Sequence, residues 1–321
     1  MTRESMNIKF DESINGKVVK ARHSATEIAI VIPALNEGEA VGKVLDGVKD
    51  VMDGYDYRVG VVDGRSIDGT DEIARRRDAD VIYQRGRGYG DALKTGFSYA
   101  EKMLDARVVV MMDADLTYDA KDIPELVGPI LKDEADLMVG NRFEGMQKGA
   151  MPFFNRVGNR LLSWIARSAL GLSIHDTQCG MRAFRSELVE NMDLVTEGMP
   201  FAIEMLAEAK FADARIGEVP ISYRPRVGKT KLSPIRDGLR ILGTTLRLMR
   251  DTKPLLFFGG IGTLLGVLGL LFGVDVTLEW IRTRTVVRLP TVMLSVLLLV
   301  GAIQFFIIGL VADMIKGLRR K

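Results

Sequence analysis

The sequence has little of what disulfide and zinc sites require. It contains one cysteine, Cys179, and two histidines, His23 and His175, among 321 residues. A single cysteine excludes an intrachain disulfide, and the wide separation of the histidines excludes zinc-type ligand spacing. The net charge of +2 does not indicate a nucleic-acid partner, and we expect none. The N-terminal segment, residues 1–26, is polar and lacks the apolar core of a signal peptide.

Charge is also scarce near the C-terminus. Two uncharged apolar runs lie there, Leu255–Val274 and Thr291–Val311. About 20 apolar residues in a helix cross the ~30 Å hydrocarbon layer of a bilayer, so each run predicts a transmembrane helix. The less favoured alternative is a pair of core helices in a soluble protein, but charged segments flank both runs. We therefore expect a membrane-spanning hairpin over residues 254–321, with a basic C-terminus.

The charges around this hairpin predict its orientation. Basic residues precede the first run and follow the second, whereas the basic connecting segment also carries Asp275 and Glu279. The positive-inside rule then favours both ends in the cytoplasm. We expect a multi-pass protein of the cell membrane with its large polar domain on the cytoplasmic side. The flanking basic residues are Arg236, Arg240, Arg247, Arg250, Lys253, Lys316, Arg319, Arg320 and Lys321.

Residues 233–253 have a different pattern. The stretch Pro234–Arg250 mixes leucines, isoleucine and methionine with four arginines. This composition predicts an amphipathic helix that lies in the membrane interface, just before the first transmembrane run. An ordinary surface helix is the alternative.

Residues 27–232 alternate between strand-like and helix-like segments, as in a mostly parallel α/β sheet. In such sheets the ligand crevice lies beyond the carboxyl ends of the strands, so the residues that follow each strand are the candidates for the site. The expected strands are Ile28–Ile32, Tyr57–Val62, Val81–Tyr83, Val108–Met112 and Leu137–Val139.

Two carboxylates follow the fourth expected strand. Asp113 and Asp115 are two residues apart, and side chains at this spacing in an extended segment point the same way. Paired carboxylate oxygens suit Mg²⁺ or Mn²⁺ beside a nucleotide diphosphate. An Asp-x-Asp pair alone is equally typical of a turn or a helix cap. Its place directly after an apolar strand favours the metal site.

Two other loops are candidates for nucleotide binding. Asp63 ends the second expected strand and could accept hydrogen bonds from a base or ribose, while Ser66 and Asp68 cap the next helix. The glycine-rich loop Arg85–Gly90 follows the third strand, whereas a dinucleotide fingerprint follows the first. Its glycines allow close approach of a nucleotide sugar, with a simple tight turn as the alternative.

Taken in order, these segments carry a resemblance. The chain resembles the family-2 glycosyltransferases of GT-A fold over about residues 27–250. It is more narrowly similar to the polyprenyl- and dolichyl-phosphate hexose synthases, which include dolichol-phosphate mannose synthase. The motifs that carry the resemblance are Val31–Glu37, Asp63–Thr70, Gly88–Ala92, Asp113–Asp115, Gly140–Arg142, Asp176–Phe184 and Arg224–Lys231.

The resemblance implies a role for each matching residue, and Arg85 is added from the glycine-rich loop. The expected donor-binding residues are Pro33, Asn36, Glu37, Asp63, Arg85, Asp113 and Lys231. Asp113 and Asp115 would hold Mg²⁺ or Mn²⁺. The expected catalytic residues are Asp115, Arg226 and Glu204. The lipid phosphate would meet Arg142, Arg156 and Arg160.

Two positions depart from the family pattern. Gly64 stands where many members have a second acid, and Thr117 stands where the mannose synthases often have a metal-coordinating glutamine. Both departures leave the donor open between GDP-mannose and a UDP-hexose.

The resemblance also implies a reaction. A hexose would pass with inversion from a nucleotide sugar to dolichyl or polyprenyl phosphate, giving a lipid-linked sugar for glycosylation. The second pKa of a phosphate monoester is near ~6, so the attacking group is already ionised and needs no strong base. A tethered nucleotide-sugar-binding protein without transferase activity, a different lipid acceptor and a homo-oligomer are left open. A processive synthase is disfavoured because the spans are too few and a Gln-x-x-Arg-Trp motif is absent.

Overall fold

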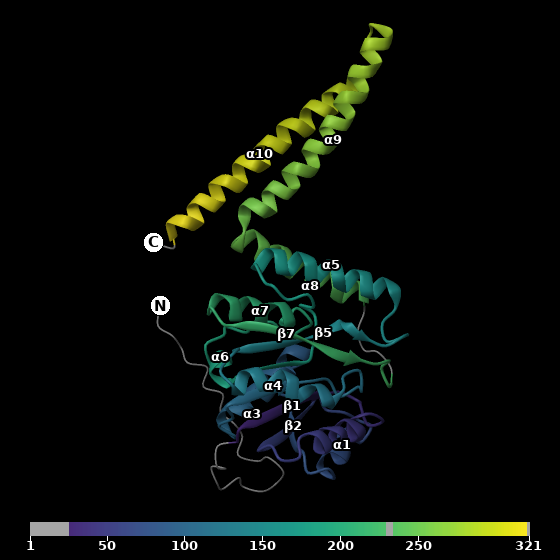
Figure 1. Ribbon diagram of the computed structural model, residues 1–321. Helices are drawn as coiled ribbons and strands as arrows, with labels where there is room; N and C mark the ends of the chain where they lie inside the picture. The colour runs from purple at the N-terminus through teal and green to yellow at the C-terminus, as the bar shows by residue number, and fades with distance from the viewer. Residues whose placement is uncertain (1–25, 229–233, 320–321) are drawn as a thin grey trace. The chain divides into compact units, whose positions relative to one another are not determined.

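The computed structural model describes residues 26–228 and 234–319 (Figure 1). The chain divides into two compact units. The first runs to Trp164 and resumes over Leu172–Ile241, and the second comprises Ile165–Gly171 and the chain from Leu242 onward.

The first unit is built on a seven-stranded sheet with the strand order β3-β2-β1-β4-β6-β5-β7. All neighbouring strands are parallel except that β6 runs antiparallel to β4 and β5. The expected mostly parallel α/β sheet is therefore confirmed. The strands are β1 Ile28–Ala34, β2 Tyr57–Asp63, β3 Asp80–Tyr83, β4 Val108–Met111, β5 Leu137–Met146, β6 Arg182–Arg185 and β7 Ile216–Tyr223.

Strand β6 has no counterpart among the strands expected from the sequence. Its four residues begin and end with arginine, so no apolar run marks it. Arg182 is nonetheless fully buried, because its guanidinium donates to the carbonyl oxygens of Cys179, Thr177 and Ala202 at 2.8–3.0 Å. Such complete pairing is what allows a cation inside a sheet. The position of β6 in the sheet is set by its pairing with β4 and β5, which lie far away in the sequence.

The helices of the first unit pack on this sheet through apolar faces. In α1, the buried Val41, Val44, Leu45 and Val48 repeat every three or four residues. In α3, Gly96 lies against β1, where an added Cβ would stand 2.2 Å from a methyl carbon of Val31. The α-helices wholly within the first unit are α1 Val41–Val51, α2 Thr70–Arg75, α3 Tyr89–Lys102, α4 Ile123–Leu131, α6 Ser186–Glu190 and α7 Phe201–Phe211. Helix α5, Phe153–Leu170, belongs to the first unit up to Trp164 and to the second unit from Ile165.

The parallel register gathers strand ends at one edge of the sheet. Ala34 of β1 pairs with Asp63 of β2, and Val31 of β1 pairs with Met111 of β4. Residues that follow β1, β2 and β4 therefore lie close to one another, although they are up to 80 positions apart in the sequence. Asp113 follows β4 at this edge.

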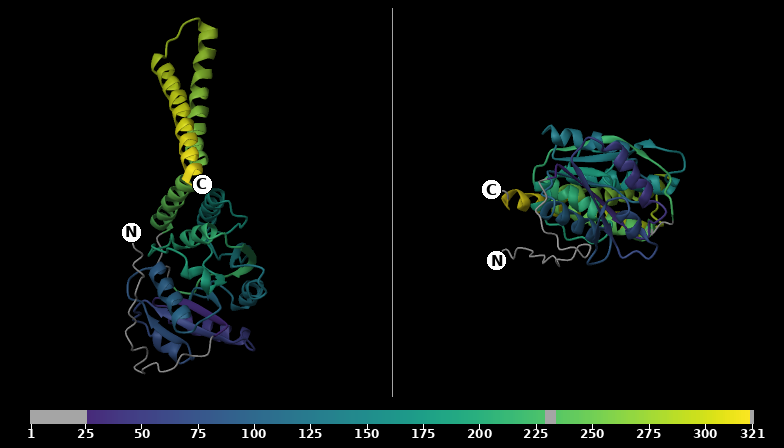
Figure 2. Two further views of the ribbon diagram at one scale, coloured as in Figure 1. Left: turned by 90° about the vertical axis from the view of Figure 1, so that its left-hand side faces the viewer. Right: turned by 90° about the horizontal axis from the view of Figure 1, so that it is seen from below.

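The second unit contains the end of α8 (Pro234–Thr252) and two long helices, α9 (Pro254–Thr283) and α10 (Leu289–Arg319). The two long helices lie side by side and antiparallel (Figures 1 and 2). Both are long and apolar enough to cross a membrane, and only 17% of the most apolar window of each is buried within the described residues. A core helix of a soluble protein would be mostly buried, so the expected hairpin of apolar helices is the better interpretation.

Candidate active site at the carboxyl edge of the sheet

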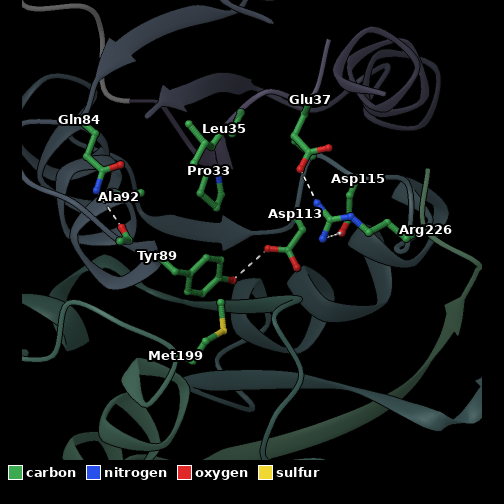
Figure 3. A pocket seen from close by; sticks show the side chains of 13 residues that line it. Pro33, Leu35, Glu37, Gln84, Tyr89, Ala92, Asp113, Asp115, Met199 and Arg226 are labelled. Atoms are coloured by element: carbon green, nitrogen blue, oxygen red, sulfur yellow. Dashed lines mark hydrogen bonds and ion pairs between the residues drawn. The ribbon is translucent and has the colours of Figure 1, made fainter. Parts of the chain in front are cut away.

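A cavity of about 290 Å³ lies at the edge where β1 and β4 end (Figure 3). Its walls combine apolar side chains with three carboxylates and one guanidinium. The lining residues are Pro33, Ala34, Leu35, Glu37, Gln84, Gly88, Tyr89, Ala92, Asp113, Ala114, Asp115, Met199 and Arg226. Five of the predicted site residues are therefore brought together here: Pro33, Glu37, Asp113, Asp115 and Arg226.

Asp113 is held from the opposite wall of the cavity. The hydroxyl of Tyr89, the first residue of α3, donates to Asp113 Oδ1 at 3.0 Å. Gly180 lies beside both groups, and an added Cβ there would stand 3.1 Å from Asp113 Oδ2 and 3.1 Å from the hydroxyls of Tyr89 and Tyr118. Any larger residue at position 180 would crowd the carboxylate, so the glycine leaves Oδ2 accessible.

Asp115 is oriented by its own neighbour. Thr117 donates to Asp115 Oδ1 through its hydroxyl at 2.5 Å and through its backbone N–H at 3.0 Å. The turn between them depends on Leu116, whose φ is +64°. Thr117 therefore fixes one oxygen of the carboxylate and directs the other, Oδ2, toward the cavity.

Arg226 joins two carboxylates from different parts of the chain. Its Nη1 lies 3.1 Å from Asp115 Oδ2, and its Nη2 donates to Glu37 Oε1 at 2.5 Å (Figure 3). The backbone N–H of Val227 also donates to the carbonyl oxygen of Asp115 at 3.1 Å. The loop after β7 is thus tied to the Asp-x-Asp turn both by charge and by its backbone.

The enclosed carboxylates fit a divalent cation. Removal from bulk water raises the pKa of Asp113 to about 7, and repulsion by Asp115 adds to this shift. A bound cation would remove the repulsion. Within the described ranges no group of three or more His, Cys, Asp or Glu side chains could hold a metal, so further ligands would have to be phosphate oxygens or water.

Two predicted donor residues lie beside the cavity. Asp63 is buried, its Oδ2 accepts from the backbone N–H of Ser66 at 2.9 Å, and its Oδ1 has no hydrogen-bond partner. A buried acceptor without a partner is rare and suits a donor from a ligand, such as a base N–H. Asn36 instead supports the loop, since its Oδ1 accepts from Ile67 N at 2.9 Å and its φ is +49°.

The glycine at position 64 has a steric explanation. An added Cβ would lie 3.3 Å from Gln84 Oε1, 3.3 Å from Leu35 Cδ1 and 3.4 Å from the carbonyl oxygen of Ala34. Gln84, which donates to the carbonyl oxygen of Gly88 at 2.8 Å, therefore occupies the space that a side chain at 64 would need. A side chain at position 64 would therefore require Gln84 or Leu35 to shift by a few tenths of an ångström.

Arg142 lies in a buried ion pair. Its Nε and Nη2 donate to the two oxygens of Asp176 at 2.7 and 2.9 Å, and its guanidinium covers the ring of Tyr223 at 5.4 Å. The bidentate pair neutralises both partners, and the structure does not bring Arg142 into the cavity.

Two further predicted residues, Glu204 and Arg85, do not line the cavity, and a third lies outside the described residues. The carboxylate of Glu204 accepts from the backbone N–H groups of Val195 and Thr196 at 3.0–3.2 Å and so anchors a loop. Arg85 is exposed in the loop after β3. Lys231 lies outside the residues that the structure describes.

The remaining predicted residues, Arg156 and Arg160, lie on α5. The Nε of Arg156 is buried without a hydrogen-bond partner, and the guanidinium of Arg160 lies 5.3 Å from the ring of Phe143. The same helix exposes large apolar side chains that are 48–85% accessible. We call them the α5 apolar face: Phe153, Phe154, Val157, Leu161 and Trp164.

Eight of the lining residues had no assigned role in the sequence-based prediction, and three of them have long side chains that carry polar or sulfur atoms: Tyr89, Gln84 and Met199. Tyr89 lies inside a quoted motif, Gly88–Ala92, and its polar ring beside the glycines was a usable signal. Gln84 follows the third strand and could have been found by the same strand-end rule as Asp63. Met199 comes from the irregular segment before α7, and no local pattern indicates it.

Known proteins resemble this chain over most of its length. Residues 29–192 match the family described as glycosyl transferase family 2. The chain is 32% identical over 296 residues to glycosyltransferase AglJ of Haloferax volcanii, covering 92% of this chain and 95% of that protein. It is 38% identical over 217 residues to a dolichyl-phosphate hexose transferase of the same organism, covering 67% and 90%. It is 28% identical over 309 residues to a dodecaprenyl-phosphate galacturonate synthase of Rhizobium johnstonii, covering 90% and 87%.

A solved structure shares the fold. Glucosyl-3-phosphoglycerate synthase of Mycobacterium tuberculosis, in complex with Mn²⁺, UDP-glucose and phosphoglyceric acid, superimposes with a TM-score of 0.59. The match covers 70% of this chain and 80% of that chain at 23% identity. At this identity the likeness concerns the fold alone, and the expected GT-A fold is confirmed.

Replacement of Tyr89 is expected to weaken metal binding. Tyr89→Phe removes the hydrogen bond that orients Asp113 and keeps the ring, so we expect about tenfold weaker Mn²⁺ binding to the purified protein. Calorimetric titration with Mn²⁺, in the absence of a nucleotide sugar, measures this affinity. The matched control is Tyr99→Phe, which removes a hydroxyl bonded to Asp80 away from the cavity. Equal Mn²⁺ affinity in Tyr89→Phe and the unaltered protein would contradict the prediction.

Metal binding is expected to depend on pH. Asp113 must lose its proton to bind a cation, and its pKa is about 7 in the metal-free protein. Mn²⁺ affinity should therefore fall about tenfold for each pH unit below ~7 and change little above ~8. Titrations at several pH values measure the dependence, and Asp113→Asn should abolish it while weakening binding throughout. Affinity that stays constant across this range would show that Asp113 is not a ligand.

Proposed function

This chain belongs to glycosyl transferase family 2, and from that premise we propose that it transfers a hexose from a nucleotide sugar to the phosphate of a polyprenyl or dolichyl lipid. Relatives that are named for dolichyl-phosphate and dodecaprenyl-phosphate substrates support this acceptor class. The donor is GDP-mannose or a UDP-hexose. The positive-inside bias supports a catalytic unit on the cytoplasmic side of the cell membrane.

The observation that carries the acceptor assignment is the α5 apolar face. Soluble domains rarely expose a contiguous group of large apolar side chains unless another surface covers it. Phenylalanine and tryptophan together with arginine on one helix are typical of an element that lies at a bilayer interface. The turns of α5 that carry this face also carry Arg156 and Arg160. If this face lies at the bilayer surface, Arg156 and Arg160 lie at the level of the lipid phosphate groups and can bind one.

Arg156 is suited to receive that phosphate. Its Nε is buried and lacks a hydrogen-bond partner, so binding an anion there satisfies a donor that the described protein leaves unpaired. A guanidinium also offers the bidentate geometry that phosphate accepts. Arg160, exposed beside Phe143, would be a second contact.

The donor diphosphate would lie in the cavity between the carboxylates and Arg226. Asp113 and Asp115 would hold Mg²⁺ or Mn²⁺, which when bound neutralises charge on the departing diphosphate. Arg226, placed by its pairs with Asp115 and Glu37, would contact the diphosphate from the other side. Asp63 would accept a hydrogen bond from the base through its unpaired Oδ1.

The proposed transfer is a single displacement. An oxygen of the lipid phosphate forms the new bond to C1 of the sugar while the bond from C1 to the diphosphate oxygen breaks, which inverts the configuration. Because the lipid phosphate is largely dianionic at neutral pH, the site needs no proton acceptor. Its residues instead align two anions and lower their repulsion, which is how electrostatic preorganisation accelerates phosphate chemistry. Roles in binding or catalysis for Asn36, Arg85, Arg142, Glu204 and Lys231 stay predictions.

The proposed reaction has a direct test. The purified full chain in lipid nanodiscs should convert polyprenyl phosphate to a hexosylated lipid with one member of a donor panel: GDP-mannose, UDP-glucose or UDP-N-acetylglucosamine. Mass spectrometry identifies the lipid product. Asp115→Ala should lower the rate by at least about a hundredfold, as removal of a charge-stabilising group does elsewhere. Donor binding without product on any lipid phosphate would instead support a nucleotide-sugar-binding protein.

A second variant separates acceptor from donor. Arg156→Ala should raise the KM for lipid phosphate about tenfold and leave the donor dissociation constant unchanged, because only the acceptor contact is lost. The matched control is Arg76→Ala at the C-cap of α2, where the exposed arginine pairs with Glu72. Equal loss of donor and acceptor binding would mean that Arg156 supports the fold of the site and does not contact the acceptor.

A further inference from the structure

Between Val292 and Val311, one exposed polar side chain interrupts the apolar surface of α10. Gln304 lies in the middle of this helix, it is exposed, and no described residue offers it a hydrogen bond. An amide without a partner in hydrocarbon is costly, so polar residues at membrane depth normally face another protein segment.

The partner of Gln304 is not the other helix of the hairpin. The seam between α9 and α10 is made by glycines of α9, where added Cβ atoms at Gly262 and Gly269 would lie 2.9 Å from α10. Ser295, the polar residue in this seam, already donates to the carbonyl oxygen of Gly269 at 2.8 Å. Ala302 is buried against α9, and Gln304 is two residues away, about 200° around the helix. Gln304 therefore points away from the hairpin seam.

Gln304 lies at the centre of a second row of side chains along α10, on a face that does not contact α9. Exposed side chains precede and follow it at alternating spacings of three and four residues, the repeat by which parallel helices pack. Apolar side chains alone would suit any lipid-facing helix, and the amide at the centre distinguishes this face. The α10 seam comprises Leu297, Val300, Gln304, Ile307 and Val311, whose apolar members are 47–68% exposed.

We propose that α10 packs through this seam against α10 of a second copy of the chain, with the two Gln304 amides hydrogen-bonded to each other. Copies inserted in one membrane have the same orientation, so their α10 helices run parallel and position 304 meets position 304. An amide has both donors and an acceptor, so the same residue on a two-fold axis satisfies both partners. The proposal rests on the membrane-spanning hairpin of the proposed function.

Cysteine cross-linking tests the geometry. In membranes containing the full chain, Val311→Cys lies in the α10 seam, whereas Leu310→Cys is about 100° around the helix at the same depth. An oxidant should give disulfide-linked dimers at least about fivefold more with Val311→Cys. The native Cys179 is buried and serves as the background in both. Equal cross-linking of the two variants would overturn the proposal.

Replacement of the amide tests its contribution. Gln304→Leu should weaken self-association about three- to tenfold, measured by energy transfer between labelled copies at varied protein-to-lipid ratios, and Gln304→Asn should retain most of it. Unchanged association in Gln304→Leu would overturn the role of the amide. Release of the chain by alkaline washing would overturn the membrane span and the dimer together. Membrane retention and normal hexose transfer without dimers would overturn the dimer alone.

Discussion

The site depends on holding two carboxylates close together in a partly dehydrated cavity. Asp113 and Asp115 repel each other, and the pKa of Asp113 rises to about 7 in consequence of that repulsion and of lost hydration. Neighbouring groups hold both against this repulsion: the Tyr89 hydroxyl on Asp113, and Thr117 and Arg226 on Asp115. A divalent cation would be attracted by the charge of the two carboxylates, and an anionic diphosphate would then be attracted by the cation, so this geometry suits a glycosyltransferase.

The sheet topology makes that arrangement possible. The parallel strands β1 and β4 deliver Pro33 and the Asp-x-Asp turn to one edge, while the antiparallel β6 starts next to Gly180 on the far side of Asp113. The loop after β7 then closes the cavity with Arg226. Each wall therefore comes from a different element, and backbone pairing within the sheet keeps these strands in register.

The proposed reaction requires a soluble donor and a membrane-bound acceptor to meet, and each of the two units has features that suit one of these needs. The first unit holds the charged cavity and the α5 apolar face, which suits a bilayer surface. The second holds two apolar helices whose glycines allow close packing without a hydrophobic driving force. Gln304 lies outside that packing and is the polar centre of the proposed self-association.

The sequence by itself determined the strand-end carboxylates, the alternation of an α/β sheet, the two apolar helices and the family, because each is written in a local period or a short motif. Only the tertiary structure decided that Arg226 pairs with Glu37, 189 residues away, that Thr117 orients Asp115, and that Gln84 occupies the space beside Gly64. It also showed that Arg142 pairs with Asp176 and that the carboxylate of Glu204 accepts hydrogen bonds from the backbone of a loop. Pairing between distant residues follows from strand order and packing, and no local pattern encodes it.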